Sequence, residues 1–441
     1  MDISSADPDI ARPRTRRGRW WPRVLIALSV ALALAAGGCS DGSPKPPARG
    51  AGPGAGPGAG AAGGALPGVG ISGHTYQVPQ PLPPAAPGTL IAANDHGTDA
   101  QIAGARRWTV LYHSRNAHDA DVPVSDVVLV PPEPPPPGGR PVVAWAHGTT
   151  GVADRCAPSH AANLGYNAYA QEIGAFLKAG YAVTATDYPG LGTPGMHTYL
   201  VGADEGNAVV DSVTAARRLV PDLAPTWFTV GHSQGGQASI FAANATKRAP
   251  GLRFGGAVAI APASHLNVML PGVIAAHNPG QLTFALYSLA GLNATDPSVG
   301  LPRLLGPSAM RTASQVFEEC INDPHPALIR TASEQAIPLD SARLAALGRT
   351  MAAYGNPDRT AVRSPLLIIQ GGNDLDVPAQ WSAQVAANLR ALGSPAITER
   401  TYPGSGHDDV LGRSSCDILD FMSKHGGRPT GACTPFRTLP G

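Results

Sequence analysis

The apolar residues of this 441-residue chain group into short runs that alternate with stretches of helical periodicity. Short apolar runs bounded by turn residues are typical of strands buried in a parallel sheet. They cover residues 141–146, 181–187, 227–230, 257–261, 365–370 and 396–402. The predicted helices cover residues 168–178, 203–220, 236–243, 378–392 and 417–424. This alternation predicts an α/β fold with a mostly parallel sheet and helices on both faces.

Two further strands and one insertion complete the predicted outline. Residues 107–112 and 126–130 predict an antiparallel pair joined by a polar loop. The strand–helix alternation stops between residues 265 and 363, where the chain is helix-prone and punctuated by proline. We expect 265–363 to form a helical cap inserted into a core of residues 88–264 and 364–441. The alternative is that its apolar residues only complete the core.

The first 39 residues predict an export signal. Six arginines precede an uncharged run at 24–36, which is shorter than the roughly 20 residues that a transmembrane helix needs. A basic segment, an apolar segment and small residues just before Cys39 are typical of a secretory signal. Cys39 resembles the lipid-modified cysteine of a bacterial lipoprotein, which predicts a lipid anchor at the outer face of the cell membrane. The alternative is ordinary signal cleavage and free secretion.

Residues 40–87 predict a flexible tether. The segment is dominated by Gly, Ala and Pro, with repeated Gly-Ala-Gly-Pro. It has too few apolar side chains to offset the entropy that ordering would cost. We expect it to hold a folded domain, which begins at Gly88, away from the membrane.

The composition excludes some classes of binding partner and of site. The net charge is +1, which excludes a broad basic surface for nucleic acid. Apart from Cys39 the chain has four cysteines, an even number in a chain expected to be exported, so two disulfides are predicted. They are Cys156, Cys320, Cys416 and Cys433. Three pairings are open, and four buried free thiols are the alternative. No Cys/His spacing indicates a metal site, and nothing in the pattern indicates an oligomeric state.

The motif Gly-His-Ser-Gln-Gly at 231–235 carries the candidate chemistry. It follows the β-prone run 227–230 and precedes the helix-prone run 236–243. A G-x-S-x-G motif between strand and helix is typical of the nucleophile turn of α/β-hydrolases, where glycines permit a turn too tight for side chains. Ser233 is therefore the candidate nucleophile. The alternative is a serine in an ordinary glycine-rich loop, so the chain must also supply a base, an acid and an oxyanion hole.

Two loops that follow predicted strands supply the base and the acid. His407 lies in a glycine-rich loop after the last strand, and Asp374 and Asp376 follow the strand at 365–370. A serine nucleophile needs an imidazole base, which a carboxylate orients and stabilises when it is charged. We expect His407 and Asp374 in these roles, with Asp376 as the alternative acid. The order serine, aspartate, histidine is that of α/β-hydrolases.

The oxyanion hole is expected to combine the residue after Ser233 with the loop after the strand at 141–146. Backbone N–H groups at such positions face the cleft in which a tetrahedral intermediate forms. The expected donors are Gln234 and either Thr149 or Thr150. His147, a second candidate base, is expected to shape this loop instead. This chemistry needs no metal and no organic cofactor.

Several motifs together resemble the secretory lipase family. They lie at residues 146–151, 154–159, 187–193, 231–236 and 372–374. The Cys-Ala-Pro-Ser and Asp-Tyr-Pro-Gly-Leu-Gly stretches among them are more specific than the G-x-S-x-G motif. The resemblance extends from Gly88 to the C-terminus, and the family includes fungal enzymes of the lipase A type and many exported actinobacterial hydrolases.

The resemblance implies an α/β-hydrolase fold with a helical cap over the active site. It implies triacylglycerol lipase or carboxylesterase activity on acyl esters, with the triad at Ser233, Asp374 and His407. It also implies two disulfides, Cys156–Cys320 and Cys416–Cys433. The lipid anchor and the tether are not features of the fungal members.

The sequence thus predicts an exported serine hydrolase that cleaves carboxylic esters, with acylglycerols as the expected substrates, through an acyl-enzyme. One alternative is an exported α/β-hydrolase peptidase with the same triad. Another is a non-enzymatic tethered surface protein whose triad is vestigial. The complete triad argues against the non-enzymatic alternative, and ester and peptide substrates distinguish the two enzymes.

Overall fold

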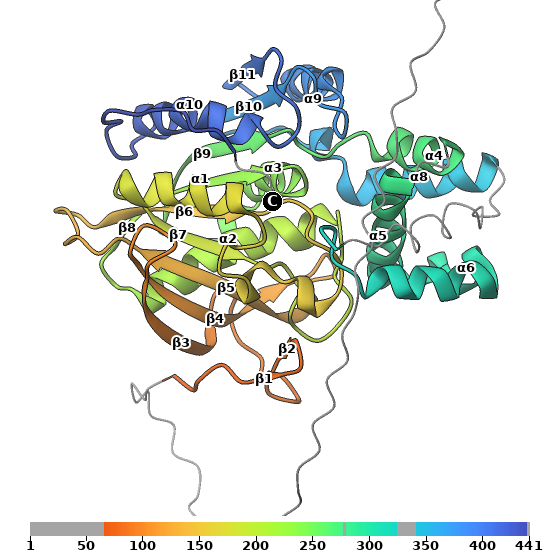
Figure 1. Ribbon diagram of the computed structural model, residues 1–441, viewed down its shortest axis with the longest axis horizontal. Helices are drawn as coiled ribbons and strands as arrows, with labels where there is room; N and C mark the ends of the chain where they lie inside the picture. The colour runs from red at the N-terminus through yellow and green to blue at the C-terminus, as the bar shows by residue number, and fades with distance from the viewer. Residues whose placement is uncertain (1–65, 277–278, 324–340, 439–441) are drawn as a thin grey trace, which may run out of the picture. The chain divides into compact units, whose positions relative to one another are not determined.

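Within the part of the chain that the structure describes, a nine-stranded mixed sheet forms the centre of the fold (Figure 1). The computed structural model describes residues 66–276, 279–323 and 341–438. The strand order is β11-β10-β9-β8-β6-β7-β5-β4-β3. The strands are β3 (Leu90–Asp99), β4 (Ala105–Arg115), β5 (Asp121–Val130), β6 (Arg140–Ala146), β7 (Ala182–Thr186), β8 (Leu223–His232), β9 (Arg253–Ile260), β10 (Leu366–Gly371) and β11 (Ile397–Tyr402). The strands from β6 to β11 pair in parallel, whereas β3, β4 and β5 are antiparallel at one edge.

Helices cover both faces of the sheet. Successive side chains of a strand point to opposite faces, so the apolar side chains of the central strands are buried only if helices pack on both sides. The helices of this core are α1 (Asn167–Lys178), α2 (Gly202–Leu219), α3 (Gln234–Asn244), α9 (Ala379–Ala391) and α10 (Val410–Lys424). In β6, Val143 and Trp145 belong to the hydrophobic cluster with α1 and α10, whereas Val142 and Ala144 belong to the cluster with α2 and α3. The predicted α/β fold with a mostly parallel sheet is therefore confirmed.

A second group of helices lies between β9 and β10 along the chain. They are α4 (Leu266–Ala276), α5 (Pro279–Thr295), α6 (Leu301–Phe317) and α8 (Ser341–Gly355). Figure 1 shows the four helices gathered beside one end of the sheet. Leu270, Leu289 and Leu305 are buried in a hydrophobic cluster that is separate from those of the sheet. The described part of the insertion predicted at 265–363 therefore packs mostly around its own apolar residues, together with Val152, Tyr199 and Leu200 of the core.

The remaining short elements are β1 (Ile71–Ser72), β2 (Thr75–Tyr76), η1 (Asp154–Cys156), η2 (Pro158–His160), η3 (Thr246–Arg248), η4 (Pro297–Val299) and η5 (Pro357–Arg359).

The folded region begins earlier than predicted. Tyr76 is buried, its N–H donates to the Gly192 carbonyl (2.7 Å), and its hydroxyl pairs with the Ser159 hydroxyl (2.8 Å). The structure thus corrects the predicted tether for residues 66–87. One anchored aromatic ring and backbone hydrogen bonds there compensate for the scarcity of apolar residues.

The closing helix α10 also differs from its predicted extent, since it begins at Val410 and not at residue 417. Gly412 and the two serines at 414 and 415 are weak helix formers, which hid the first turns in the sequence. Val410 and Leu411 are fully buried against the core, so packing stabilises those turns despite the low propensity.

The predicted signal segment with Cys39, and the predicted tether up to residue 65, lie outside the described residues. Among the residues that are described, no helix is both long and apolar enough to cross a membrane.

Both disulfides that the resemblance implies are present. Cys156 pairs with Cys320, with their Cα atoms 5.4 Å apart, and Cys416 pairs with Cys433 at 5.7 Å. The first disulfide joins the loop after β6 to the chain that follows α6, and an isolated β-bridge between Gly151 and Cys320 lies beside it. The inserted helices are therefore covalently tied to η1, in the segment that follows β6.

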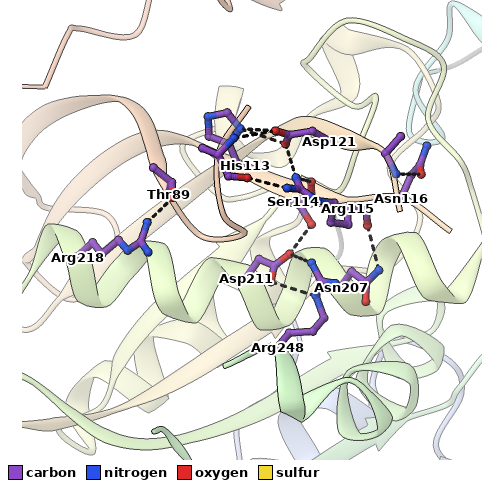
Figure 2. A network of polar contacts seen from close by, with 12 residues as sticks. Thr89, His113, Ser114, Arg115, Asn116, Asp121, Asn207, Asp211, Arg218 and Arg248 are labelled. Atoms are coloured by element: carbon purple, nitrogen blue, oxygen red, sulfur yellow. Dashed lines mark hydrogen bonds and ion pairs between the residues drawn. The ribbon is translucent and has the colours of Figure 1, made fainter. Parts of the chain in front are cut away.

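Buried polar contacts hold α2 against the antiparallel part of the sheet (Figure 2). The Ser114 hydroxyl on β4 donates to Asp211 on α2 (2.7 Å), and Arg248 binds the same carboxylate through two N–H groups (2.6 and 3.1 Å). The Asn207 amide donates to the carbonyl of Arg115 (3.0 Å). A buried carboxylate is costly unless it is paired, and Arg248 pairs this one. These contacts fix α2, whose first turn reaches the candidate site.

Candidate active site

Ser233 lies in a strained turn between β8 and α3. Its φ and ψ are 57° and −116°, a conformation that costs a residue with a side chain on the order of 1–3 kcal/mol. Three backbone hydrogen bonds hold it there: its N–H donates to the Ile260 carbonyl (2.8 Å), and its carbonyl accepts from Gln237 and Ala263 (both 3.1 Å). Strain that the surroundings maintain in this way is typical of functional positions.

The two motif glycines are required by close approach of the backbone. A methyl group on Gly231 would overlap the carbonyl of Gly235, and one on Gly235 would overlap the carbonyl of Ala146. The end of β6 therefore lies directly against the first turn of α3. This contact brings the loop after β6 (147–151, here the oxyanion loop) next to Ser233.

His407 and Asp374 form a hydrogen-bonded pair. His407 Nδ1 lies 2.8 Å from Asp374 Oδ2, and the loop that carries it (403–409, here the His407 loop) follows β11. Asp374 Oδ1 accepts from the N–H groups of Asp376 and Val377 (2.9 and 2.8 Å), and Oδ2 also accepts from the Gln370 amide (2.8 Å). These hydrogen bonds hold the Asp374 carboxylate in the orientation in which Oδ2 faces the His407 imidazole.

The pair shifts both pKa values in opposite directions. Burial alone would raise the pKa of Asp374, but the hydrogen bond and charge of His407 outweigh burial, so the pKa of Asp374 is lowered. Burial alone would lower the pKa of His407, but the hydrogen bond and charge of Asp374 raise it above its usual value. Asp376 is exposed and donates its N–H to Asp374. The structure therefore pairs His407 with the expected carboxylate and not with the alternative one.

Ser233 and His407 line the same cavity, of about 420 Å³. Its walls include Tyr166, Tyr169, Tyr199, Val268, Met269, Val273, Phe284 and Trp381. Among the described residues, no hydrogen bond joins the Ser233 hydroxyl to the His407 ring. Such contacts are often long without substrate and tighten when it binds. The structure thus brings Ser233 and His407 to one cavity, and Asp374, which does not line the cavity, bonds to His407 from behind it.

The predicted oxyanion donors differ in their position. Gln234 is the first residue of α3, so its N–H has no partner within the helix and lies at the positive end of the helix dipole. Thr149 lines the cavity, its hydroxyl pairs with the Tyr199 hydroxyl (2.7 Å), and its carbonyl accepts from the Tyr166 hydroxyl (2.7 Å). Thr150 is buried and does not line this cavity. Thr149 is therefore the better placed of the two threonines.

His147 lies behind the oxyanion loop. It is buried, its Nδ1 is 2.7 Å from the Gly148 carbonyl oxygen, and burial lowers its pKa to about 4. It does not line the cavity with Ser233. This position agrees with the expectation that His147 shapes the loop.

A buried polar cluster beneath the turn was not predicted from the sequence. The Gln234 side-chain amide lies 2.7 Å from Glu205 Oε1 and 2.9 Å from His197 Nε2. Burial raises the pKa of Glu205 to about 8 and lowers that of His197 to about 3, so burial favours the neutral form of both side chains. In the sequence, Glu205 has the pattern of an acidic residue that stabilises a helix N-terminus. Only the tertiary structure, in which α2 and α3 pack together, shows that Glu205 orients the Gln234 side chain.

Two groups of side chains could hold a cation beside the triad. They are His232 with His407 and Asp408, and Asp374 with Asp376 and His407. In each group the candidate ligand atoms lie within 4.8 Å of one another. Both groups share His407, whose Nδ1 is already bonded to Asp374, so a cation in the second group would compete with that bond.

Residues 158–331 match the Secretory lipase family, and residues 338–427 match the Prolyl oligopeptidase family. No curated protein sequence matches the chain.

Solved structures share the architecture. Lipase A of Candida antarctica in its closed state has a TM-score of 0.64 and 20% identity, over 80% of this chain and 86% of that chain. The rice cell wall degrading esterase LipA of Xanthomonas oryzae has a TM-score of 0.60 and 19% identity, over 77% of this chain and 100% of that chain. At these identities the similarity shows the α/β-hydrolase fold alone. With the family match, it confirms the predicted resemblance of this chain to the secretory lipase family.

Proposed function

We propose that the protein hydrolyses carboxylic esters, with Ser233 as nucleophile, His407 as base and Asp374 as the acid that orients it. The observation that carries this proposal is the Asp374–His407 pair, at 2.8 Å, whose His407 lines the same cavity as the strained Ser233. A nucleophile, an imidazole and an orienting carboxylate are the groups that acyl transfer requires.

The reaction follows from these positions. Ser233 Oγ attacks the ester carbonyl carbon while its proton passes to His407 Nε2. The N–H groups of Gln234 and Thr149 stabilise the oxyanion, and the leaving alcohol takes the proton from His407. A water molecule then loses its proton to His407 and attacks the acyl carbon; the bond from that carbon to Ser233 Oγ breaks, His407 returns the proton to Oγ, and the acid is released.

Acyl esters are the substrates that this cavity favours. Val268, Met269 and Val273 on α4 and Phe284 on α5 line it together with Trp381. Apolar walls of this kind gain free energy by burying an acyl chain, at about 0.8 kcal/mol per CH₂. The inserted helices would thus form the cap that contacts the chain, and triacylglycerols and simple carboxylic esters are both within this class.

A panel of substrates tests the proposal and its rival. The match of residues 338–427 to the Prolyl oligopeptidase family favours a peptidase as the second candidate. We expect turnover of p-nitrophenyl esters from acetate to palmitate, and no comparable kcat/KM for chromogenic peptide amides of matched size. Peptide turnover without ester turnover would instead establish the peptidase.

Asp374 and Asp376 provide a matched pair of variants. Asp374→Asn keeps the shape of the side chain but removes the charge that stabilises the imidazolium, and the expected loss in kcat is about 10⁴-fold. Asp376→Asn is expected to change kcat by only a few fold, because the Asp376 carboxylate lines the cavity but, among the described residues, is not hydrogen-bonded to His407.

The pH profile gives an independent readout of the same pair. His407 must be neutral to act as base, so kcat/KM rises with pH through the pKa of His407, which Asp374 raises. In Asp374→Asn this limb is expected to move to lower pH. An unshifted limb, or an equal loss of activity in Asp376→Asn, would show that Asp374 is not the acid.

We also propose that the protein is exported and that Cys39 anchors it through a lipid to the outer face of the cell membrane, with free secretion as the alternative. The support is the basic and apolar N-terminal sequence that ends in Cys39. Membrane retention that persists in Cys39→Ser would rule out the anchor.

A further inference from the structure

A chain of hydrogen bonds joins the three loops that carry the proposed catalytic groups. The Gly148 N–H in the oxyanion loop donates to the Tyr169 hydroxyl on α1 (3.0 Å). That hydroxyl lies 3.1 Å from Nδ1 of His232, the residue before Ser233. His232 Nε2 lies 3.0 Å from the carbonyl oxygen of His407. Tyr169 and His232 therefore connect the oxyanion loop, the Ser233 turn and the His407 loop.

The direction of each hydrogen bond follows from its fixed ends. A backbone N–H only donates, so the Tyr169 oxygen accepts from Gly148 and its own O–H is free to donate to His232 Nδ1. A backbone carbonyl only accepts, so His232 Nε2 carries the proton that reaches His407. The imidazole of His232 is thus neutral, with its proton on Nε2.

Burial supports this assignment. His232 and Tyr169 are both buried, and burial lowers the pKa of His232 to about 3, with the nearby His407 adding to the effect. Burial also raises the pKa of Tyr169, so the hydroxyl keeps the proton that it donates. At neutral pH neither group changes its charge, and the chain of hydrogen bonds stays intact.

The packing leaves little freedom in this arrangement. A methyl group on Gly148 would overlap the Tyr169 hydroxyl and lie 3.3 Å from His232 Nδ1. The His232 and His407 rings lie 4.6 Å apart, and the Trp145 ring packs edge-on against Tyr169 at 5.2 Å. Tyr169 and His232 therefore fix the distance between the oxyanion loop and the His407 loop, because the packing leaves these two side chains little room to move.

We propose that Tyr169 and His232 are positioning residues, which hold the oxyanion loop and the His407 loop at the distances from Ser233 that acyl transfer requires. This inference rests on the proposed ester hydrolysis. Oxyanion donors act only within about 2.7–3.1 Å of the developing charge, and a displacement of about 1 Å can cost about 100-fold in rate. Loss of a link should therefore lower kcat and leave KM nearly unchanged.

Single and double variants test this role. Tyr169→Phe keeps the ring and removes the hydroxyl, and His232→Asn keeps an acceptor for Tyr169 but no longer reaches the His407 carbonyl. Each is expected to lower kcat for p-nitrophenyl butyrate by about 10- to 100-fold. Because the two links act in series, the double variant should lose about as much as one single variant, and not the product of both losses.

A conservative substitution and a matched tyrosine complete the design. His232→Gln places an amide N–H where Nε2 was, so it should retain more of kcat than His232→Asn. If Tyr169→Phe does not fold, the comparison of these two His232 variants still tests the positioning role. Tyr181→Phe is the control, since the Tyr181 hydroxyl also accepts a backbone N–H (Arg428, 2.8 Å) but does not line the cavity. Its kcat should equal that of the wild type.

The outcomes separate this proposal from the proposed function. Wild-type ester turnover with an unchanged kcat in Tyr169→Phe, or with fully multiplicative losses in the double variant, would overturn the positioning role and leave ester hydrolysis standing. A wild-type protein without ester turnover and without fluorophosphonate labelling of Ser233 would overturn both.

Discussion

Ser233→Ala is expected to lower kcat for p-nitrophenyl esters by about 10⁵-fold or more, while the protein remains folded. Removal of the nucleophile from a serine triad leaves only the contribution of substrate binding and of the oxyanion hole. The fold should tolerate the change, because alanine keeps the Cβ atom and the backbone hydrogen bonds of the turn do not involve the hydroxyl. Initial rates and circular dichroism spectra of both proteins, compared at the same pH, measure the two effects.

A buried serine on α3, the helix that follows Ser233, provides the control for this result. The Ser239 hydroxyl on α3 pairs with Thr229 on β8 (3.1 Å) and does not line the cavity. Ser239→Ala should cost about 1 kcal/mol of stability, as expected for one hydrogen bond, and leave kcat unchanged. The nucleophile assignment would be falsified if Ser233→Ala kept more than about 1% of wild-type kcat, given the expected loss, or if a fluorophosphonate labelled another residue.

Gly235→Ala is expected to prevent folding to the native state. The added methyl group would overlap the carbonyl carbon and oxygen of Ala146 and lie 2.7 Å from the carbonyl oxygen of His147. These are backbone atoms at the end of β6, a central strand, so no side-chain rotation can relieve the overlap. Relief requires α3 to move away from β6, which would break the buried packing between them. The expected cost exceeds about 4 kcal/mol, the range of exceptionally destabilising substitutions.

The matched control is another buried glycine in a helix. A methyl group on Gly174, in α1, would have no heavy atom of the described residues within 4 Å other than the adjacent backbone of its own helix. Gly174→Ala should therefore be neutral, or raise stability by about 0.5–1 kcal/mol, because alanine favours the helical backbone. Thermal unfolding measures both variants. A cooperative Gly235→Ala transition near the wild-type temperature would contradict the close contact of α3 with β6.

The sequence predicted the layered core correctly because its signals are local. Each central strand, such as β6 or β10, is a short apolar run between turn residues, and each helix behind it has helical periodicity. In a parallel sheet the loops after the strands meet at one edge. The positions of Ser233, Asp374 and His407 after three such strands therefore predicted a shared site, and in the structure Ser233 and His407 line one cavity while Asp374 bonds to His407.

Predictions that depended on weak local signals were less accurate. The start of α10 was predicted too late because its first turns contain glycine and serine, and the ordered segment at 66–87 was predicted as tether because it has few apolar residues. In both segments, contacts with distant parts of the chain stabilise what local propensity does not. Tyr76, which bonds to Gly192 and Ser159, is the clearest example.

The sequence by itself determined the fold class, the resemblance to secretory lipases and the residues that are candidates for the chemistry. Only the tertiary structure decided that Asp374 and not Asp376 reaches His407, and that Thr149 and not Thr150 lines the cavity. It alone brought Tyr169 and His232 between the loops. Residue type and periodicity can be read directly from the sequence, but the direction of a side chain in a loop depends on contacts with segments far away in sequence.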